Sequence, residues 1–552
     1  MLHPPRPPRL SAAEALAALS RRTPQAIKRP SSAPSEAYPR ALAKTASLAS
    51  RTSPLTREEA RHLLRRAGYV APPAKVDALV GLPANEAVDQ LIADALSAPL
   101  PPEPDWATQQ PPGENASDAE VVAFFDMNFE WAYRYAASIL EDAAEHPLRS
   151  RMTVFWHNHF VTEIDIYALA AFGYRNLELF RGHGLGSFKF LVREIGIQPA
   201  MLLYLDGFLN QASSPNENYA RELLELFTTG IIGPDGSPNY TETDIEELAR
   251  ALTGWIVRWR ELQVDFLPFF HDGGQKTILG RTGNFGYDDV IDLIFEERPT
   301  AIAHFVSAKI YREFVQAEPD SAIVEQLATT FLTSDFDVAS VVRQLLSSEH
   351  FFDLGLRGAQ IKNPIEFAYG LPLESPLYED PEYLYILYFL AADLGQFVLQ
   401  PPNVAGWEGG RTWITTSTLA KRWDYSGFLI WGRGEDRGEE PALDMIGLAD
   451  LLHDRNAREA PFELAVRLAE HVIGVPVDQL SVESGVEFIG DLNTFPIPDT
   501  VAQGPAVHVE LAKRMLNGWI PWYDWDLNAD YASDVLRVYL TYLFELPELQ
   551  LA

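Results

Sequence analysis

The sequence contains no cysteine among its 552 residues. Without a thiol, the chain cannot form a disulfide, bind a metal through thiolates or use a cysteine nucleophile. Any metal would need ligands from His, Asp, Glu or Asn. The sequence also has no run that reaches the ~18 to 20 apolar residues of a membrane-spanning helix. We therefore expect a protein without a membrane span.

Positive charge is scarce. The chain has 44 Lys and Arg residues against 77 Asp and Glu, a formal net charge of −33, and only nine of the 44 are lysines. This negative field repels nucleic acid and anionic membranes, which excludes both as principal partners. Apolar residues make up 47% of the sequence, and a chain of this length exceeds what one core supports. We therefore predict two lobes.

Three regions differ in composition. Residues 1–54 are rich in Pro, Ser and Arg and cannot build a core, so we predict a disordered tail. This tail lacks the apolar segment of a secretory signal. Residues 55–432 form the predicted main helical domain. A charged, glycine-containing stretch begins at 433, and residues 433–552 are predicted to be a C-terminal helical segment that packs on the main domain.

Apolar residues recur mostly at helical spacing, and long alternating runs are rare. This pattern predicts a mainly α, multi-helix, two-lobed architecture. The exception lies near 262–280, where Val264 and Phe266 precede Asp272-Gly273-Gly274. That order predicts a small β-hairpin that turns on the Asp-Gly-Gly unit. Upstream, Ser214-Pro215-Asn216-Glu217 is typical of a capping box at the start of a helix.

The first candidate cluster is the stretch 155–160, Phe-Trp-His-Asn-His-Phe. In a helix, His159 shares an apolar stripe with Met152 and Phe155, while His157 lies about 200° away. The two histidines could then not bind the same ion. Either of them is a candidate metal ligand. The alternative is a core His159 hydrogen-bonded to the backbone, with His157 at a surface.

The second cluster is a polar stripe on the next predicted helix, formed by Asn218, Glu222, Glu225 and Thr229. Carboxylates three residues apart on one helix face can converge on a metal. Ordinary structural roles explain part of the pattern, because Glu217 belongs to the capping box and Arg221 can pair with Glu225. Asn218 and Glu222 are left unexplained.

Two further clusters lie downstream. His271, Asp272 and Lys276 surround the predicted turn, which by itself explains only the Asp and Gly residues. Trp407 and Trp413 follow Asn403 on a loop rich in Pro and Gly, where they could stack on a ligand or fill a lobe interface. The sequence has no nucleophile elbow, Walker loop, dinucleotide fingerprint, zinc-protease helix or EF-hand loop.

Taken in order, these clusters resemble the bacterial family known as domain of unknown function 1800. The matching stretches are 155–160, 199–202 with 204–206, 216–226, 249–255, 271–272 with Lys276, and 401–404 with 406–407. The resemblance runs from about residue 55 to the C-terminus and implies no activity. It does imply an exported or envelope role beside a phosphatase- or sulfatase-like partner, although we see no export signal in this N-terminus.

Two functions are consistent with these patterns. The first is a metal-assisted hydrolase or related enzyme that uses Zn²⁺, Fe²⁺ or Mn²⁺. Its ligands would be His157 or His159, Glu222 and His271, with Asn218 and Asp272 as further ligands or their supports. Glu225 would be the general base, and Arg221 or Lys276 would contact an anionic group. This hypothesis requires three distant segments to meet within ~2.0 to 2.3 Å of one ion.

The second is a non-catalytic scaffold or binding protein that acts with a partner. The polar clusters would then be caps, turns and buried pairs that hold helices together. Trp407, Trp413 and Asn403 would form the recognition surface of such a protein.

Overall fold

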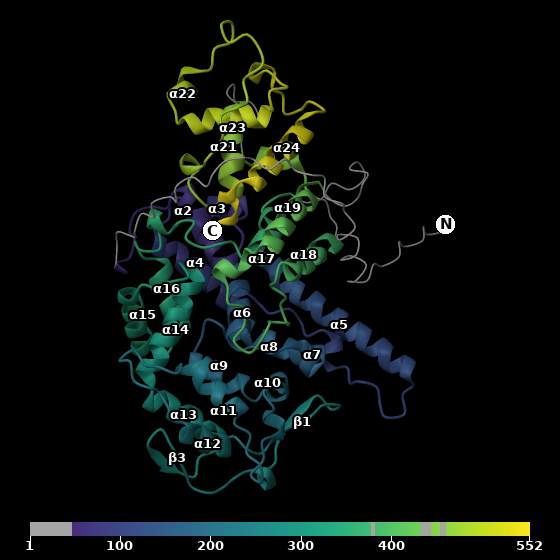
Figure 1. Cartoon of the computed structure of the whole chain (residues 1–552), viewed down its shortest axis with the longest axis vertical. Coiled ribbons are helices and arrows are strands. Elements are labelled where there is room, and N and C mark those ends of the chain that lie inside the picture. Colours follow the sequence, from purple (N-terminus) through teal and green to yellow (C-terminus); the bar gives the residue numbers. More distant parts are fainter. Residues whose placement is uncertain (1–46, 377–380, 432–442, 453–459) are drawn as a thin grey trace.

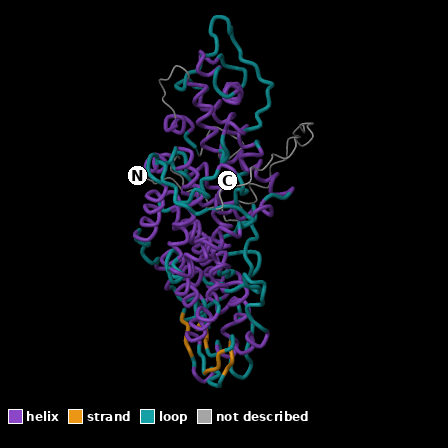
Figure 2. The backbone as a smooth tube through the Cα atoms, turned by 90° about the vertical axis from the view of Figure 1, so that its left-hand side faces the viewer, coloured by secondary structure: helices purple, strands orange, loops and turns teal. Residues whose placement is uncertain are grey.

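The computed structural model describes residues 47–376, 381–431, 443–452 and 460–552. The predictions for residues 1–46 of the tail and for the charged stretch 433–442 lie outside the described residues. The molecule is elongated, with its short strands at one end and the C-terminal helices at the other (Figures 1 and 2). Helices dominate, which confirms the mainly α prediction.

The helices of the first half are α2 (Arg57–Gly68), α3 (Pro73–Leu79), α4 (Ala84–Ser97), α5 (Asp118–Glu141), α6 (Pro147–His159), α7 (Ile164–Tyr167), α8 (Ala170–His183), α9 (Phe188–Ile195), α10 (Pro199–Tyr204), α11 (Asn218–Glu222), the π-helix Leu223–Thr228 and α12 (Glu242–Ala251). Those of the second half are α13 (Tyr287–Glu297), α14 (Pro299–Phe314), α15 (Ser321–Thr333), α16 (Val338–Leu346), α17 (Pro364–Leu373), α18 (Pro381–Asp393), α19 (Thr416–Trp431), α20 (Met445–Leu452), α21 (Ala460–Val472), α22 (Asp499–Ala502), α23 (Ala506–Leu516) and α24 (Ala532–Glu545). The strands are β1 (Trp255–Arg258), β2 (Gln263–Phe266), β3 (Lys276–Ile278) and β4 (Arg281–Gly283).

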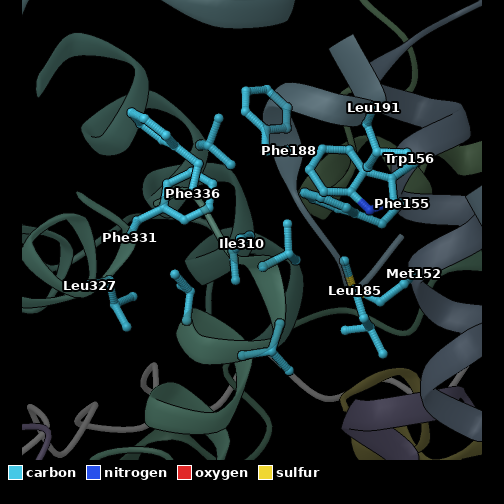
Figure 3. Close-up of a cluster of buried hydrophobic side chains, with 14 of the residues drawn as sticks. Met152, Phe155, Trp156, Leu185, Phe188, Leu191, Ile310, Leu327, Phe331 and Phe336 are labelled. Carbon is cyan, nitrogen blue, oxygen red and sulfur yellow. The ribbon is translucent and has the colours of Figure 1, made fainter. Parts of the chain in front are cut away.

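Buried apolar residues form two clusters. The first core is built on α2, α4, α9 and α12–α16, and the second core on α5, α8, α17–α21, α23 and α24. Figure 3 shows part of the first core, where Trp156 lies beside Phe188, with ring centroids 5.5 Å apart. Phe188 in turn approaches Phe331, at 6.0 Å. Aromatic rings from α6, α9 and α15 thus pack against one another.

Helix α6 lies between the two cores. Pro147 occupies its first turn, where the missing N–H costs no hydrogen bond. Every residue of α6 except Asn158 is buried. It contributes Met152, Phe155 and Trp156 to the first core and Val154 to the second. A helix buried on all sides fixes the direction of each of its side chains, so α6 positions both histidines of the 155–160 cluster.

Two small antiparallel strand pairs confirm the predicted β-hairpin element in a mainly α fold, but the turn lies elsewhere than predicted. The β1–β2 pair runs from Trp255 opposite Phe266 to Arg258 opposite Gln263, and β3 pairs antiparallel with β4. The β3–β4 turn falls at Leu279 and Gly280, which both have positive φ, as a tight hairpin turn requires. Asp272-Gly273-Gly274 instead lies in the connection between the two pairs. Asp272 forms an ion pair there with Arg250. This contact explains why the Asp-Gly-Gly unit does not form the hairpin turn.

The start of α11 also differs from the prediction. The helix begins at Asn218 and its preceding residue, Glu217, makes no side-chain cap, so Ser214 does not open a capping box. The Asn216 side chain accepts the Asn218 N–H at 2.9 Å instead. Among the described residues, no helix is long and apolar enough to cross a membrane, as expected.

The described end of the predicted tail is docked rather than free. Leu48 is buried in the first core, and Arg51 forms ion pairs with Glu59 of α2 and with Glu349. Leu48 and Arg51 at the end of the predicted tail therefore contact the folded part of the chain.

Candidate functional site

His157 holds the 399–407 loop against α6. Its Nε2 atom accepts the Leu399 N–H at 2.9 Å, and its ring meets Trp407 edge-on, with centroids 5.8 Å apart. Burial lowers the pKa of His157 from 6.5 to about 4, so the ring is neutral. His157 is therefore buried, not at a surface, and its accepting nitrogen is already occupied by the backbone.

Asn158 holds the same loop one turn further on. Its Oδ1 atom accepts the Trp407 N–H at 2.6 Å. Gly406 has φ +82°, and a Cβ atom there would lie 2.2 Å from Oδ1 of Asn158. Only glycine allows this close approach of the two backbones. The Gly-Trp dipeptide is thus explained by a docking contact with α6.

The tryptophans of this loop face inward. Trp407 and Trp413 are 7% and 8% exposed and belong to the second core. The Asn403 side chain accepts the Ala405 N–H at 2.9 Å, which closes a local turn. The two rings therefore fill the core in this structure and present no face to a ligand.

His159 lies on the other side of α6 and contacts the π-helix. Its Nε2 atom is 2.9 Å from the carbonyl oxygen of Phe227, and its Nδ1 atom is 3.0 Å from Nζ of Lys309. This network implies that Nε2 carries the proton and that Nδ1 accepts from the lysine. Burial lowers the pKa of Lys309 to about 7. His159 is thus the core histidine that the alternative interpretation described.

The π-helix interrupts the predicted polar stripe. Because its hydrogen bonds run from i to i+5, Thr229 does not continue the line of Asn218 and Glu222. Thr229 is buried and donates to the carbonyl oxygen of Leu224 at 2.9 Å. Arg221 pairs with Glu217 and Glu242, not with Glu225. Asn218 is exposed at the start of the helix.

Three glutamates near the π-helix have no cationic partner among the described residues. The Glu163 carboxylate accepts from the Tyr204 hydroxyl at 2.5 Å, and Glu225 accepts from Tyr240 at 3.1 Å. Glu222 has neither a hydrogen bond nor an ion pair in the described part of the chain. Its pKa is raised, first by burial and then by the Glu225 charge. We call Glu163, Glu222, Glu225 and Tyr204 the glutamate cluster.

The 271–276 segment forms a separate unit. Asp272 accepts from Arg250 at 2.7 Å, and this contact holds the pKa of Asp272 below its usual range. His271 Nδ1 lies 3.0 Å from the carbonyl oxygen of Thr253. Lys276 is buried and its Nζ donates to the carbonyl oxygens of Asp272 and Gly274. All three side chains therefore stabilise the connection between the strand pairs.

Within residues 47–376, 381–431, 443–452 and 460–552, no group of three or more His, Asp or Glu side chains is arranged to hold a metal ion. Among the described residues, His157, Glu222 and His271 therefore do not form such a group, and a bound metal stays a prediction. The structure places the 155–160 cluster between two other candidate stretches. On one side His157 contacts the 399–407 loop. On the other side His159 contacts the π-helix that continues the 216–226 stretch.

The sequence did not predict three residues of this site, Tyr204, Lys309 and Glu163. Tyr204 lay in a stretch that matched the family, but nothing in the sequence linked it to Glu163. Lys309 lies within the largely apolar helix α14. A lysine among apolar residues is a sequence signal that could have identified it as a site residue. Glu163 directly follows the 155–160 cluster but belonged to no pattern.

The chain matches a family described as "Protein of unknown function (DUF1800)" over residues 62–516. The chain belongs to the DUF1800 family. No curated protein and no solved structure matches it. The match confirms the resemblance and includes the whole glutamate cluster of this DUF1800 chain. The family description assigns no reaction, so chemistry has to be argued from the side chains.

The pKa values of Glu222 and Tyr204 in the glutamate cluster are both raised. A carboxyl group with a raised pKa keeps its proton to a higher pH, while a nearby carboxylate can accept a proton. Burial and the two neighbouring carboxylates raise the pKa of Tyr204, so its hydroxyl keeps its proton and donates to Glu163. In this DUF1800 member, the other acids of the candidate motifs are neutralised, Asp272 by Arg250 and Glu217 by Arg221.

Proposed function

We propose that this protein is a hydrolase that uses carboxylate acid–base chemistry, with Glu222 as the general acid. The observation that carries the proposal is a half-buried Glu222 with a raised pKa, beside the Glu225 carboxylate and without an ion pair among the described residues. Burying carboxylates unpaired is costly, and such groups with shifted pKa values are typical of catalytic sites.

The roles follow from the environment of each group. Glu222, in its protonated form, donates a proton to the leaving group of the substrate. Glu163, oriented by the Tyr204 hydroxyl at 2.5 Å, acts as the base that activates water or as the nucleophile. Three neighbouring carboxylates repel anions, so the substrate is a neutral or cationic molecule with a glycosidic, ester or amide bond.

The test is turnover of chromogenic glycosides, esters and amides by the full chain. Glu222→Gln and Glu163→Gln should each lower kcat by about 10²- to 10⁴-fold, as expected for loss of an acid or a base. The matched control is Glu217→Gln, an exposed glutamate one turn earlier that pairs with Arg221. Equal rates in Glu222→Gln and the control, or no turnover of any of these substrates, would refute the proposal.

A bound Zn²⁺, Fe²⁺ or Mn²⁺ stays a separate prediction, and the acid–base scheme does not depend on it. Elemental analysis of the purified chain beside Glu222→Ala and His157→Ala tests it. Stoichiometric metal that is lost in both variants would support a metal site. Metal content that is negligible, or equal in all three proteins, would oppose it.

A second candidate function is binding to a partner protein, and one surface favours it. Leu209, Phe266 and Phe269 are 52%, 41% and 89% exposed on adjoining segments at the strand-bearing end (Figure 1). Exposed apolar groups of this kind mark interaction sites. The expected partner is the phosphatase- or sulfatase-like protein. Calorimetry with that protein should show binding that Phe269→Ser abolishes and that Leu354→Ser, an exposed apolar residue elsewhere, leaves unchanged.

A further inference from the structure

A second site lies far along the chain from the glutamate cluster. It is a cavity with about 900 Å³ of empty space, part of it open to solvent. Its walls come from α2, α17, the end of α21 and the C-terminal residues after α24, which lie close together in Figure 1. Arg61, Arg65, Arg66, Arg357 and Lys362 line it, an unusual concentration of cations in a chain of net charge −33.

Three of these cations donate only to backbone oxygens. Arg61 donates to the carbonyl oxygen of Glu470 at 2.8 Å, and Lys362 donates to that of Val472 at 2.9 Å. Arg66 donates to the carbonyl oxygens at positions 314 and 313, at 3.0 and 3.3 Å. None of the three forms an ion pair within the described part of the chain. Neighbouring glutamates act on these three cations through their charge, but without a direct ion pair among the described residues.

The carboxylates around the cavity already have cations of their own. Glu374 pairs with Arg65 at 2.5 Å, and Glu366 pairs with Arg151 at 2.7 Å. Glu58 pairs with Arg357 at 3.2 Å. Glu470 lies 3.9 Å from Arg467. Arg61, Arg66 and Lys362 are therefore the cations of the lining that have no ion pair in the described part of the chain, and five cations face four glutamates around the cavity.

Hydrogen-bond donors are left over as well. Nη1 of Arg66, Nε of Arg61 and Nε of Arg357 are buried without an acceptor among the described residues. Arg66 is 2% exposed and Arg61 is 7% exposed. Burial, which the charges of neighbouring glutamates only partly offset, lowers the pKa of both arginines to about 10 and that of Lys362 to about 7. Buried charges and unsatisfied donors are costly unless a ligand meets them.

We propose that this cavity binds a phosphate group, either free or as a phosphate monoester. A phosphate oxyanion would meet two arginines and one lysine that have no ion pair among the described residues, and its tetrahedral oxygens can accept from several donors at once. Guanidinium groups suit phosphate because their planar N–H groups bind two oxygens together. The site shares no residue with the glutamate cluster, so it stands independently of the proposed hydrolysis.

The test is calorimetric titration of the full chain with inorganic phosphate, at an ionic strength held constant with sodium chloride. We expect saturable binding of one phosphate per chain. Lys362→Met should weaken it about ten- to a hundredfold, the loss of one charge-assisted hydrogen bond. Arg193→Gln is the matched control, because Arg193 pairs with Asp288 and Asp292 outside the cavity.

If Lys362→Met does not fold, Arg61→Gln takes its place, since Arg61 makes no ion pair that its loss would break. A crystal structure with phosphate should show the ion in contact with Nη1 of Arg66. The proposal is overturned if chloride at equal ionic strength produces the same heat. It is also overturned if the cavity variants bind as tightly as Arg193→Gln, or if the phosphate is found elsewhere.

Discussion

At the scale of single residues, the buried His157 makes the free energy of unfolding depend on pH. Its pKa is lowered by burial to about 4 in the folded chain, whereas an unfolded histidine titrates near 6.5. Between these values the unfolded state binds the extra proton, so the free energy of unfolding falls as pH drops from 6.5 to 4. One such group contributes a slope of about 1.4 kcal/mol per pH unit.

His157→Gln should remove that contribution while a side-chain oxygen still accepts the Leu399 N–H. Urea denaturation across this pH range should therefore show a shallower acid slope than in the wild type. His183→Gln is the control, because His183 is exposed. An unchanged slope in His157→Gln would mean that the ring is not buried and neutral.

A second prediction concerns the pH dependence of activity and rests on Glu222. As a general acid it works only while protonated, and its pKa is raised by burial and by Glu225. Hydrolysis should therefore be lost as pH rises through this raised pKa, above the ordinary 4.5 of a glutamate. In Glu225→Gln one neighbouring charge disappears, so the alkaline limb of the kcat profile should move to lower pH. A limb that stays in place would assign it to another group.

At the scale of elements, the loop 399–407 is held by a contact that tolerates no side chain at Gly406. Gly406→Ala should destabilise the chain in chemical denaturation. Gly236→Ala is the matched control, since Gly236 has the same φ of +82° but its Cβ would meet nothing within 4 Å. The control carries only the left-handed strain of about 1–2 kcal/mol. Gly406→Ala should cost about 1–3 kcal/mol more, and equal losses would contradict the docking role.

The same elements mark what could be predicted from the sequence. The stripe through Met152 and Phe155 predicted α6, and the capping box of Thr56 with Glu59 at the start of α2 is a sequence signal of the same kind. These signals are local. The roles of the histidines are not local, because His157 bonds to a residue 242 positions away and His159 to one 68 positions away. Periodicity cannot report such partners.

The glutamate cluster was predicted only in part, for the same reason. Glu222 and Glu225 stood out on one helix face. The change to a π-helix after Glu222 had no sequence signal of the kind that caps and glycines provide. Glu163 and Tyr204 join the cluster through the packing of α7 on α10, which depends on the whole fold.

At the scale of the whole molecule, charge is divided between surface and interior. The surplus of 77 acidic over 44 basic residues leaves an acidic exterior, while several arginines are almost fully buried. Arg66, Arg151 and Arg422 are among the largest buried side chains. Cations placed inside such a chain need either a buried carboxylate or a bound anion. The Arg151 network uses the first solution and the proposed phosphate cavity the second.

Arg151 joins the two cores. It extends from α6 to Glu313 at the end of α14 in the first core, and to Glu366 at the start of α17 in the second. Burial alone would raise the pKa of Glu366, but Arg151 and Arg66 hold it below its usual value. Removing Arg151 therefore leaves a buried carboxylate without its closest cation. Breaking a buried pair in this way costs about 3–5 kcal/mol.

We expect Arg151→Met to lower the free energy of unfolding by this amount in urea denaturation. Adding Glu366→Gln removes the uncompensated charge, so the double variant should regain at least about 1 kcal/mol relative to Arg151→Met alone. Arg134→Met is the control, because Arg134 is a partly exposed arginine with two glutamate partners and should cost less than about 1 kcal/mol. Strictly additive losses in the double variant would show that Arg151 acts by packing rather than by charge. The two cores would then be joined by apolar contacts along α6 alone.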